Sequence, residues 1–344
     1  MRMTKLWYAP VLLAAGMVVA GPSVNPAAAA ACKTMRKINI GVAVSPPNVV
    51  HTTPYVAKEL GYFKKHCLDV DIIQFEGGSS PAAKAAAAQG TALISVTPVA
   101  VGRGVKVRQI WGLAPRLPQS YMVSADIKTA KDLKGKKLSA VGGGVGGFNW
   151  VMGAAVLKSA GLKPDDAQFI AGATAGRLPG LVSGQINGVS LHPESVFLAH
   201  KKNPGLHVLA ELSELMPDYY FNAYGAQIAW IERDHDLMVD AVAAMIEANR
   251  TMYRDEAKVV PIIMKATGRP KDAVEYAWKA LTSHCVWSVN TGYDAKRTEW
   301  TIDHDLEVGY IKKKPSVKDV FDPGIANEAV KKLGGPVTIG KCKE

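Results

Sequence analysis

The sequence predicts an α/β fold of two lobes, each a mainly parallel sheet flanked by helices. Short apolar segments are followed by capped helix starts, glycines stop the first helices at Gly61 and Gly90, and the same unit recurs after Asp132. Alternating strands and helices are typical of parallel sheets with right-handed crossovers. The 344 residues, 48% of them apolar, suffice for two such lobes.

The first lobe repeats one unit. Apolar segments at 37–44, 70–75 and 92–97 predict buried strands. A hydroxyl residue and a proline follow each of them, as expected of an N-cap and a first helical position, at Thr53-Pro54, Ser80-Pro81 and Thr97-Pro98. The helix N-termini then meet at the carboxyl edge of the sheet, where open α/β sheets bind ligands.

The second lobe has the same pattern. Strands are expected at 137–142, 168–171 and 186–191, with helices at 148–160, about 175–183 and from Pro193. The chain is expected to pass between the lobes near 121–126 and to return near 221–230. From Asp236 it becomes mainly helical, with apolar residues on one stripe.

The N-terminus resembles a secretory signal. Arg2 and Lys5 precede an apolar stretch at 6–20, and alanines at 27–31 offer cleavage positions. The stretch is short and contains Pro10, so a cleaved signal over 1–31 is favoured over a membrane anchor. This predicts a periplasmic protein; a lipid-modified Cys32 is the alternative, although eleven residues separate it from the apolar stretch.

Four cysteines, Cys32, Cys67, Cys285 and Cys342, are an even number that an oxidising compartment allows to pair. They are scattered, which argues against a metal site. Cys32 and Cys67 each precede a strand, and neighbouring parallel strands start at the same edge. We therefore predict disulfides Cys32–Cys67 and Cys285–Cys342.

Charge and motifs exclude several functions. The net charge of +11 is spread along the chain and only 7% of residues are aromatic, so no nucleic-acid site is expected. Gly142, Gly144 and Gly147 satisfy GxGxxG, but no acidic residue ends the next strand, so we expect an anion-cradling loop or a tight turn without a dinucleotide. No metal, cofactor or catalytic motif is identified, and the prediction is a protein that is not an enzyme.

A family resemblance rests on the order of several motifs. Residues 38–44, 55–63, 68–71 and 85–90 look like the opening of the nitrate/sulfonate/taurine family of ABC-transporter substrate-binding proteins, and 132–137, 159–162 and 183–185 agree. The match covers most of 36–335. Two departures are Asn187, where the family often has an acidic residue, and His66-Cys67, which replaces an acidic-glycine pair and suggests a disulfide particular to this subgroup.

The resemblance implies a type II-like periplasmic-binding-protein fold. It implies one lobe of 36–122 plus 226–344, an inserted lobe of 123–225, and hinge closure on a ligand that is passed to an inner-membrane permease with its ATPase. We expect a monomer. The alternatives are a secreted sensor domain and an enzyme like the related thiamine-pyrimidine synthases, whose cysteine-rich motif is absent here.

The candidate ligand site follows from the strand-to-helix turns. Its predicted residues are Ser45, Asn48, His51, Thr52, Ser79, Ser80, Thr97, Pro98, Gly144, Gly146, Gly147, Phe148, Asn149, His192, Glu194, Tyr220 and Asn222. For His192 and Glu194, helix capping is the alternative. Hydroxyls and free N–H groups suit an anion, and the aromatic residues of the returning crossover suit an apolar remainder.

We therefore expect a small organic anion, a sulfonate or an aromatic carboxylate, with a neutral pyrimidine or thiamine precursor as the main alternative. Arg177 and Arg116 are candidates for a charged contact, with a surface location as the alternative reading.

Overall fold

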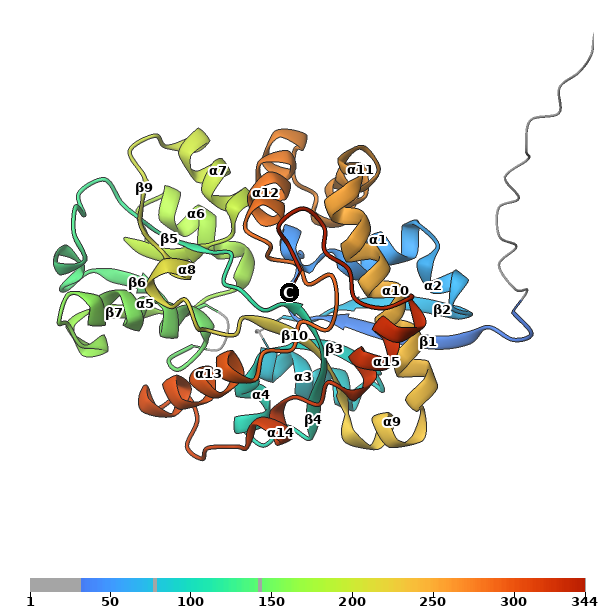
Figure 1. The fold of residues 1–344 in the computed structure, drawn as a ribbon. Coiled ribbons are helices and arrows are strands. Elements are labelled where there is room, and N and C mark those ends of the chain that lie inside the picture. The colour runs from blue at the N-terminus through green and yellow to red at the C-terminus, as the bar shows by residue number, and fades with distance from the viewer. Residues whose placement is uncertain (1–31, 77–78, 142–143, 344) are drawn as a thin grey trace, which may run out of the picture. The chain divides into compact units, whose positions relative to one another are not determined.

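The computed structural model describes residues 32–76, 79–141 and 144–343. Its strands form two five-stranded sheets with the same kind of topology. Figure 1 shows the two sheets with helices packed around each of them. The mixed α/β class with helices on each sheet is as predicted; the predicted signal at 1–31 lies outside the described residues.

The first sheet has the order β2-β1-β3-β10-β4. Its strands are β1 (Arg36–Val42), β2 (Leu68–Gln74), β3 (Leu93–Val96), β4 (Val107–Ala114) and β10 (Asn222–Gln227). β1 pairs in parallel with β2 and β3, whereas β10 is antiparallel to both β3 and β4. The returning strand β10 therefore lies inside the sheet and holds β4 to β3.

The second sheet has the order β7-β6-β8-β5-β9. Its strands are β5 (Ser120–Val123), β6 (Lys137–Ser139), β7 (Gln168–Ile170), β8 (Gly188–Leu191) and β9 (His207–Glu211). β6 is parallel to β7 and β8, and the crossing strand β5 is antiparallel to β8 and β9. Each sheet therefore has one antiparallel strand, next to its edge.

Helices follow most of the parallel strands and cover the sheets. They are α1 (Thr53–Glu59), α2 (Tyr62–Lys65), α3 (Ser79–Ala88), α4 (Pro98–Gly102), α5 (Phe148–Ser159), α6 (Arg177–Val182), α7 (Pro193–Lys202) and α8 (Leu212–Leu215). The C-terminal part adds α9 (Ile228–Arg233), α10 (His235–Arg254), α11 (Glu256–Thr267), α12 (Lys271–Ser283), α13 (Ala295–Glu307), α14 (Val317–Val320) and α15 (Gly324–Lys332). α10 packs against α1, α2 and α15.

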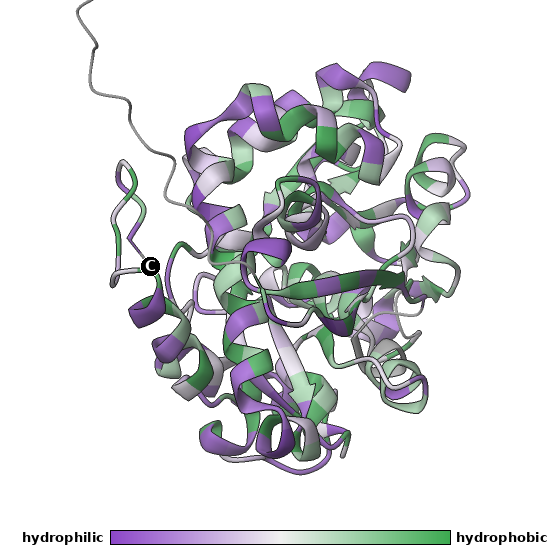
Figure 2. Ribbon diagram, turned by 90° about the vertical axis from the view of Figure 1, so that its right-hand side faces the viewer, coloured by the Kyte–Doolittle hydropathy of each residue, from purple (hydrophilic) through white to green (hydrophobic). Residues whose placement is uncertain are grey.

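The sequence pattern explains the main buried elements. β3 and β5 are buried at every position, as expected of strands covered on both faces. On α10 the apolar stripe that includes Val239, Val242 and Ile246 is buried. Figure 2 shows hydrophobic segments in the sheets and more hydrophilic ones along the outer helices. Burial of apolar surface, about 25 cal/mol per Å², is the main force that holds these layers together.

Two predicted helix starts need correction. α3 begins at Ser79, so Ser80 lies inside the helix and is not its N-cap. Thr53 was expected to cap α1, but it is the first helical residue, and Thr52 is the N-cap. The side chain of Thr53 instead donates to Asn249 Oδ1 at 2.7 Å. The hydroxyl thus joins α1 to the buried face of α10. The partner of this hydroxyl lies almost two hundred positions away in the chain, so no local pattern could identify it.

The lobe boundaries remain a proposal, but the sheets show which strands each boundary divides. Residues 222–225, assigned above to the inserted lobe, pair within the first sheet as part of β10. Residues 120–122, assigned to the first lobe, pair within the second sheet as part of β5. Both crossing segments therefore contain a strand. β10 is paired within the first sheet and β5 within the second.

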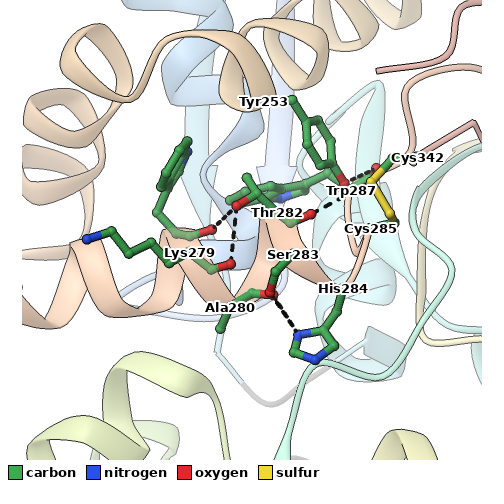
Figure 3. The surroundings of a disulfide bond; sticks show 10 residues. Tyr253, Lys279, Ala280, Thr282, Ser283, His284, Cys285, Trp287 and Cys342 are labelled. Carbon is green, nitrogen blue, oxygen red and sulfur yellow. Dashed lines mark hydrogen bonds between the residues drawn. A yellow bond between two sulfur atoms is a disulfide. The ribbon is translucent and has the colours of Figure 1, made fainter. Parts of the chain in front are cut away.

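All four cysteines are disulfide-bonded, and the predicted bond between Cys285 and Cys342 is confirmed. Cys285, which follows α12, is bonded to Cys342 near the C-terminus, and Cys32 and Cys67 are likewise disulfide-bonded. Figure 3 shows the first bond beside Trp287 and Tyr253, whose hydroxyl donates to the Trp287 carbonyl oxygen at 2.8 Å. The bond fastens the C-terminal segment to the end of α12.

Candidate ligand-binding site

A cavity of about 70 Å³ lies where the carboxyl ends of strands from both sheets approach each other. It receives side chains from the turns after β1, β3 and β8, from the N-terminus of α5, and from the two crossing segments. Its lining residues are Ala43, Val44, Asn48, His51, Thr97, Gln119, Phe148, Asn149, Thr174, Arg177, His192, Phe221 and Asn222. This is the edge at which open α/β sheets bind ligands.

Arg177, the first residue of α6, supplies a positive charge to the cavity. The side chain is buried, with the whole residue 7% exposed. Its guanidinium donates only to neutral oxygens, namely the carbonyls of Thr174 (3.3 Å) and Ser190 (3.4 Å) and the Asn48 amide (3.5 Å). Burial lowers the pKa of Arg177 to about 10, so it is a cation at neutral pH.

No carboxylate within the described ranges comes within 4.0 Å of this guanidinium, since every ion pair found there involves other residues. A buried cation held by long hydrogen bonds to neutral groups is incompletely compensated. Glu194 and Glu76 attract the guanidinium from farther away, and an anionic ligand oxygen in the cavity would supply a direct partner. The cavity is therefore electrostatically suited to an anion.

Two histidines contribute neutral rings to the cavity, in contrast to the charged Arg177. The rings of His51 and His192 meet edge to face at 5.6 Å between centroids, and Phe221 lies within 6.0 Å of both. Burial, with the nearby Arg177 charge, lowers the pKa of His51 to about 3 and places that of His192 well below its usual value. Both imidazoles are therefore neutral at physiological pH and act as single donors and acceptors.

Phe148 extends this ring cluster. Its ring lies 5.6 Å from Phe221 and 6.3 Å from Tyr219, between centroids. It is the first residue of α5, directly after the N-cap Gly147. Gly144 and Gly146 adopt positive φ, +69° and +75°, which most side chains avoid. The glycine loop thus turns the start of α5 so that an aromatic ring faces the cavity.

Hydrogen bonds fix the polar wall beside it. Asn149 donates from Nδ2 to the Val141 carbonyl (2.7 Å) and accepts at Oδ1 from Ser190 (2.5 Å), so its orientation is determined. Gln119 Nε2 donates to His192 Nε2 at 3.3 Å, which leaves the proton of this neutral ring on Nδ1. These contacts hold the second sheet's contribution in place before any ligand binds.

Glu194 lies just behind the cavity wall in the first turn of α7. Its residue is 0% exposed, and its Oε1 accepts from the Val49 backbone N–H at 3.3 Å. Val49 belongs to a short helical turn (Val49–His51) after β1, so this bond joins elements of the two sheets. Burial raises the pKa of Glu194, an effect that nearby Arg269 and Arg177 partly oppose.

The cavity brings together only part of the predicted site. Seven predicted residues line it: Asn48, His51, Thr97, Phe148, Asn149, His192 and Asn222. Ser45 instead donates to Gln74, Thr52 to the Val49 carbonyl, and Tyr220 to the Gly292 carbonyl, while Pro98 is buried at the start of α4. Gly144, Gly146 and Gly147 shape the loop without lining the cavity. The side chains of Ser79 and Ser80 lie outside what the structure describes.

Sequence reasoning left several lining residues out of the predicted site. Gln119 precedes β5, which was read as a connection between lobes, so nothing marked it as a site residue. The sequence identifies Arg177 only as a candidate for a charged contact, with a surface location as the alternative. Arg116, the other candidate, is exposed and lines a wider groove of about 460 Å³ together with Glu211 and Glu214. The two arginines therefore have different surroundings.

Other kinds of site find no support. Among the described residues, no group of three or more His, Cys, Asp or Glu side chains is placed to hold a metal ion. In the same residues, no helix is both long and apolar enough to cross a membrane. Two segments combine a histidine with two aspartates, Asp234-His235-Asp236 and Asp303-His304-Asp305. Neither forms a possible metal site in the described part of the chain.

Comparisons with solved structures show the fold. The alkanesulfonate-binding protein SsuA of Xanthomonas axonopodis pv. citri, bound to MOPS, superposes with a TM-score of 0.67 at 14% identity, over 84% of this chain and 99% of that one. The periplasmic nitrate-binding protein NrtA of Synechocystis PCC 6803 gives a TM-score of 0.68 at 14% identity, over 87% and 89%. This chain thus has the fold of periplasmic binding proteins.

The sequence comparisons identify relatives. A Haemophilus influenzae protein named for thiamine biosynthesis is 30% identical over 147 residues, 41% of this chain. The match spans about half the length of that curated relative, 46% of it. The family model described as NMT1/THI5 like matches residues 48–258, more than half of the chain and nearly all of the cavity lining. The chain belongs to the NMT1/THI5-like family.

Proposed function

We propose that this chain is the extracytoplasmic solute-binding protein of an ABC importer. It captures a small organic anion, a sulfonate or an aromatic carboxylate, by hinge closure and delivers it to an inner-membrane permease. The observation that carries this proposal is the buried guanidinium of Arg177 in the cavity wall, which donates only to carbonyl and amide oxygens. Glu194 and Glu76 attract this cation only from beyond ion-pair distance, so an anion in the cavity would be its direct partner.

The rest of the cavity agrees with an organic anion. The rings of Phe148 and Phe221, with the neutral imidazoles of His51 and His192, give one side of the cavity an apolar, flat surface. Such a mixture of apolar walls and a few polar groups is typical of small-molecule sites. It favours a ligand with a planar or apolar part over bare nitrate.

Hinge closure is supported by contacts on both sides of the cavity. Arg103, at the end of α4, donates to the Gly146 carbonyl in the glycine loop at 2.7 Å. On the other side, Lys201 of α7 pairs with Asp272 of α12 at 2.6 Å. Both contacts join elements of different sheets and both are surface interactions of small energy. They suit a closed form that opens readily when the ligand leaves.

Titration calorimetry tests the proposed ligand class. The panel contains benzenesulfonate, benzoate, short alkanesulfonates, nitrate and a neutral aminopyrimidine. We expect one or more organic anions to bind with a dissociation constant in the micromolar range or below, and their affinity to exceed that of nitrate and the pyrimidine. Tight binding of the pyrimidine, with no response to any organic anion, would contradict the proposal.

Small-angle scattering tests closure on the ligand. The two sheets are connected by the crossing segments and by contacts across the cavity, among them the bond from the Val49 N–H to Glu194. We expect these contacts across the cavity to separate in the ligand-free protein, which then populates a more open form. The radius of gyration should fall when the tightest anion of the panel is added at saturation. An unchanged scattering curve at saturation would argue against hinge closure and leave the ligand class untouched.

A second candidate is capture of a neutral pyrimidine or thiamine precursor. It is favoured by the neutral state of His51 and His192, whose imidazoles can pair with ring nitrogens, and by the name of the Haemophilus relative. The same calorimetric panel separates the two candidates. A secreted sensor would bind the same ligand, so its distinction rests on the partner, a receptor in place of a permease. We propose binding without turnover in either case.

A further inference from the structure

The polar atoms of the cavity include donors and acceptors. The His192 Nδ1–H is a buried donor without a partner among the described residues. On the Arg177 side there are further donors. Asn48 Oδ1 accepts from the guanidinium at 3.5 Å, and because a guanidinium cannot accept, this contact fixes the amide with Nδ2 as a donor. Asn48 Nδ2 is buried, with no hydrogen-bond partner in the described part of the chain. This side offers a cation and a free N–H to the same ligand group.

On the side of the crossing segments there are acceptors. Gln119 precedes β5 and Asn222 begins β10, and the two residues are 1% and 4% exposed. Because Gln119 Nε2 donates to His192, the Oε1 of this lining residue is left as an acceptor. Within the described residues, neither Gln119 Oε1 nor Asn222 Oδ1 has a partner. Two buried carbonyl oxygens of the lining thus lack a donor.

A purely anionic ligand would satisfy only one of these two sides. A buried carbonyl left without a donor carries a free-energy cost, and a carboxylate or sulfonate offers it only further oxygens. A ligand that also has an N–H or O–H group removes this cost. Sites built to bind such a group discriminate strongly against analogues that lack it.

We infer that the ligand is an organic anion that also carries a hydrogen-bond donor, an amino or hydroxyl group, which meets Asn222 and Gln119 while the anionic group meets Arg177 and Asn48. This inference rests on the proposed function and narrows its ligand class. The neutral rings of Phe148, Phe221 and the two histidines flank the part of the ligand between these two groups.

Matched pairs of probes test the inference on the unmodified protein. Calorimetry compares ethanesulfonate with 2-hydroxyethanesulfonate, benzenesulfonate with its three monohydroxy forms, and benzoate with the three monohydroxy- and monoaminobenzoates. We expect the best donor-bearing member of at least one pair to bind tenfold or more tightly than its parent. Anions that bind with equal affinity throughout all pairs would overturn the inference while leaving the proposed function intact.

Substitutions locate the effect. Asn222→Leu keeps the approximate size of the side chain but removes the acceptor, and should reduce the difference within the selective pair to less than threefold. Gln119→Met tests the second acceptor in the same way. Asn327→Leu, an identical change at an exposed position of α15, is the control and should leave the difference unchanged.

The outcomes separate the two levels of the proposal. If no anion of the panel binds, the proposed function fails and the inference fails with it. If the difference within the selective pair survives both Asn222→Leu and Gln119→Met, the donor group is recognised elsewhere and the inference is wrong. If either variant does not fold, the other variant and the pairs measured on the unmodified protein still decide.

Discussion

Replacing Arg177 by methionine is expected to lower the affinity for the tightest organic anion about 100-fold. A charge-assisted hydrogen bond contributes about 1.5 to 3 kcal/mol, and the variant also loses the only cation among the described residues that line the cavity. Arg177→Lys should retain part of the affinity, since it keeps the charge but loses the planar set of donors. Titration calorimetry gives the three dissociation constants.

Stability distinguishes a binding role of Arg177 from a structural one. The guanidinium is buried against neutral oxygens, so its removal also relieves the desolvation of a charge. The free energy of unfolding of Arg177→Met should therefore stay equal or rise, measured by urea denaturation without ligand. Arg116→Met, at the exposed arginine of the wider groove, is the matched control and should keep full affinity. A loss of stability as large as the loss of binding energy would show that Arg177 acts structurally.

Acidification is expected to destabilise the ligand-free protein through its buried histidines. Burial lowers the pKa of His51 from 6.5 to about 3, so its contribution to stability is present above about pH 6.5 and is lost as the pH falls toward 3. At pH 5 the loss from His51 is about 2 kcal/mol, 1.5 pH units at about 1.36 kcal/mol each. The depressed pKa of His192 adds a loss of the same sign.

Other buried groups stabilise the fold more in acid than at neutral pH. The test therefore compares the change in the free energy of unfolding between the wild type and a variant. Burial raises the pKa of Asp305 to about 6, and Asp240 and Glu247 raise that of His66, so both contributions are larger in acid. Urea denaturation of the wild type and His51→Phe at pH 7.5 and 5.0 gives the contribution of His51 to the change in the free energy of unfolding. Between these pH values the wild type should lose about 2 kcal/mol more than the variant. The exposed His284→Phe serves as control, and equal losses in wild type and His51→Phe would contradict the prediction.

The parts of the fold that could be predicted are those in which local pattern and final structure agree. β1 and β3 are apolar segments followed by helix signals, and parallel strands covered on both faces require such segments. β10, Asn222–Gln227, contains asparagine, glycine and glutamine, and few residues of high strand propensity. It becomes a strand because β3 and β4 both pair with it. Pairing between distant segments has no local signature.

The candidate site shows the same division. Asn48, Thr97 and His192 follow strands, and the rule that ligands bind at the carboxyl edge of parallel strands places them together without knowledge of side chains. Arg177 reaches the cavity from the first turn of α6 because its long side chain can extend back toward β8, where it meets the Ser190 carbonyl. Gln119 reaches it only because β5 is a strand. Neither fact depends on a motif, so neither could be read from the sequence.

The position of β10 in the first sheet also bears on the order in which the protein folds. The second sheet is made from one continuous stretch, from Ser120 in β5 to Glu211 in β9, and can form as soon as that stretch has been synthesised. The first sheet cannot be completed at that stage, because β3 and β4 do not pair with each other and β10 pairs with both of them. Contacts between distant segments form slowly. The inserted sheet is therefore expected to be the early folding unit, and the cavity, which needs Asn222 and Phe221, to be assembled last.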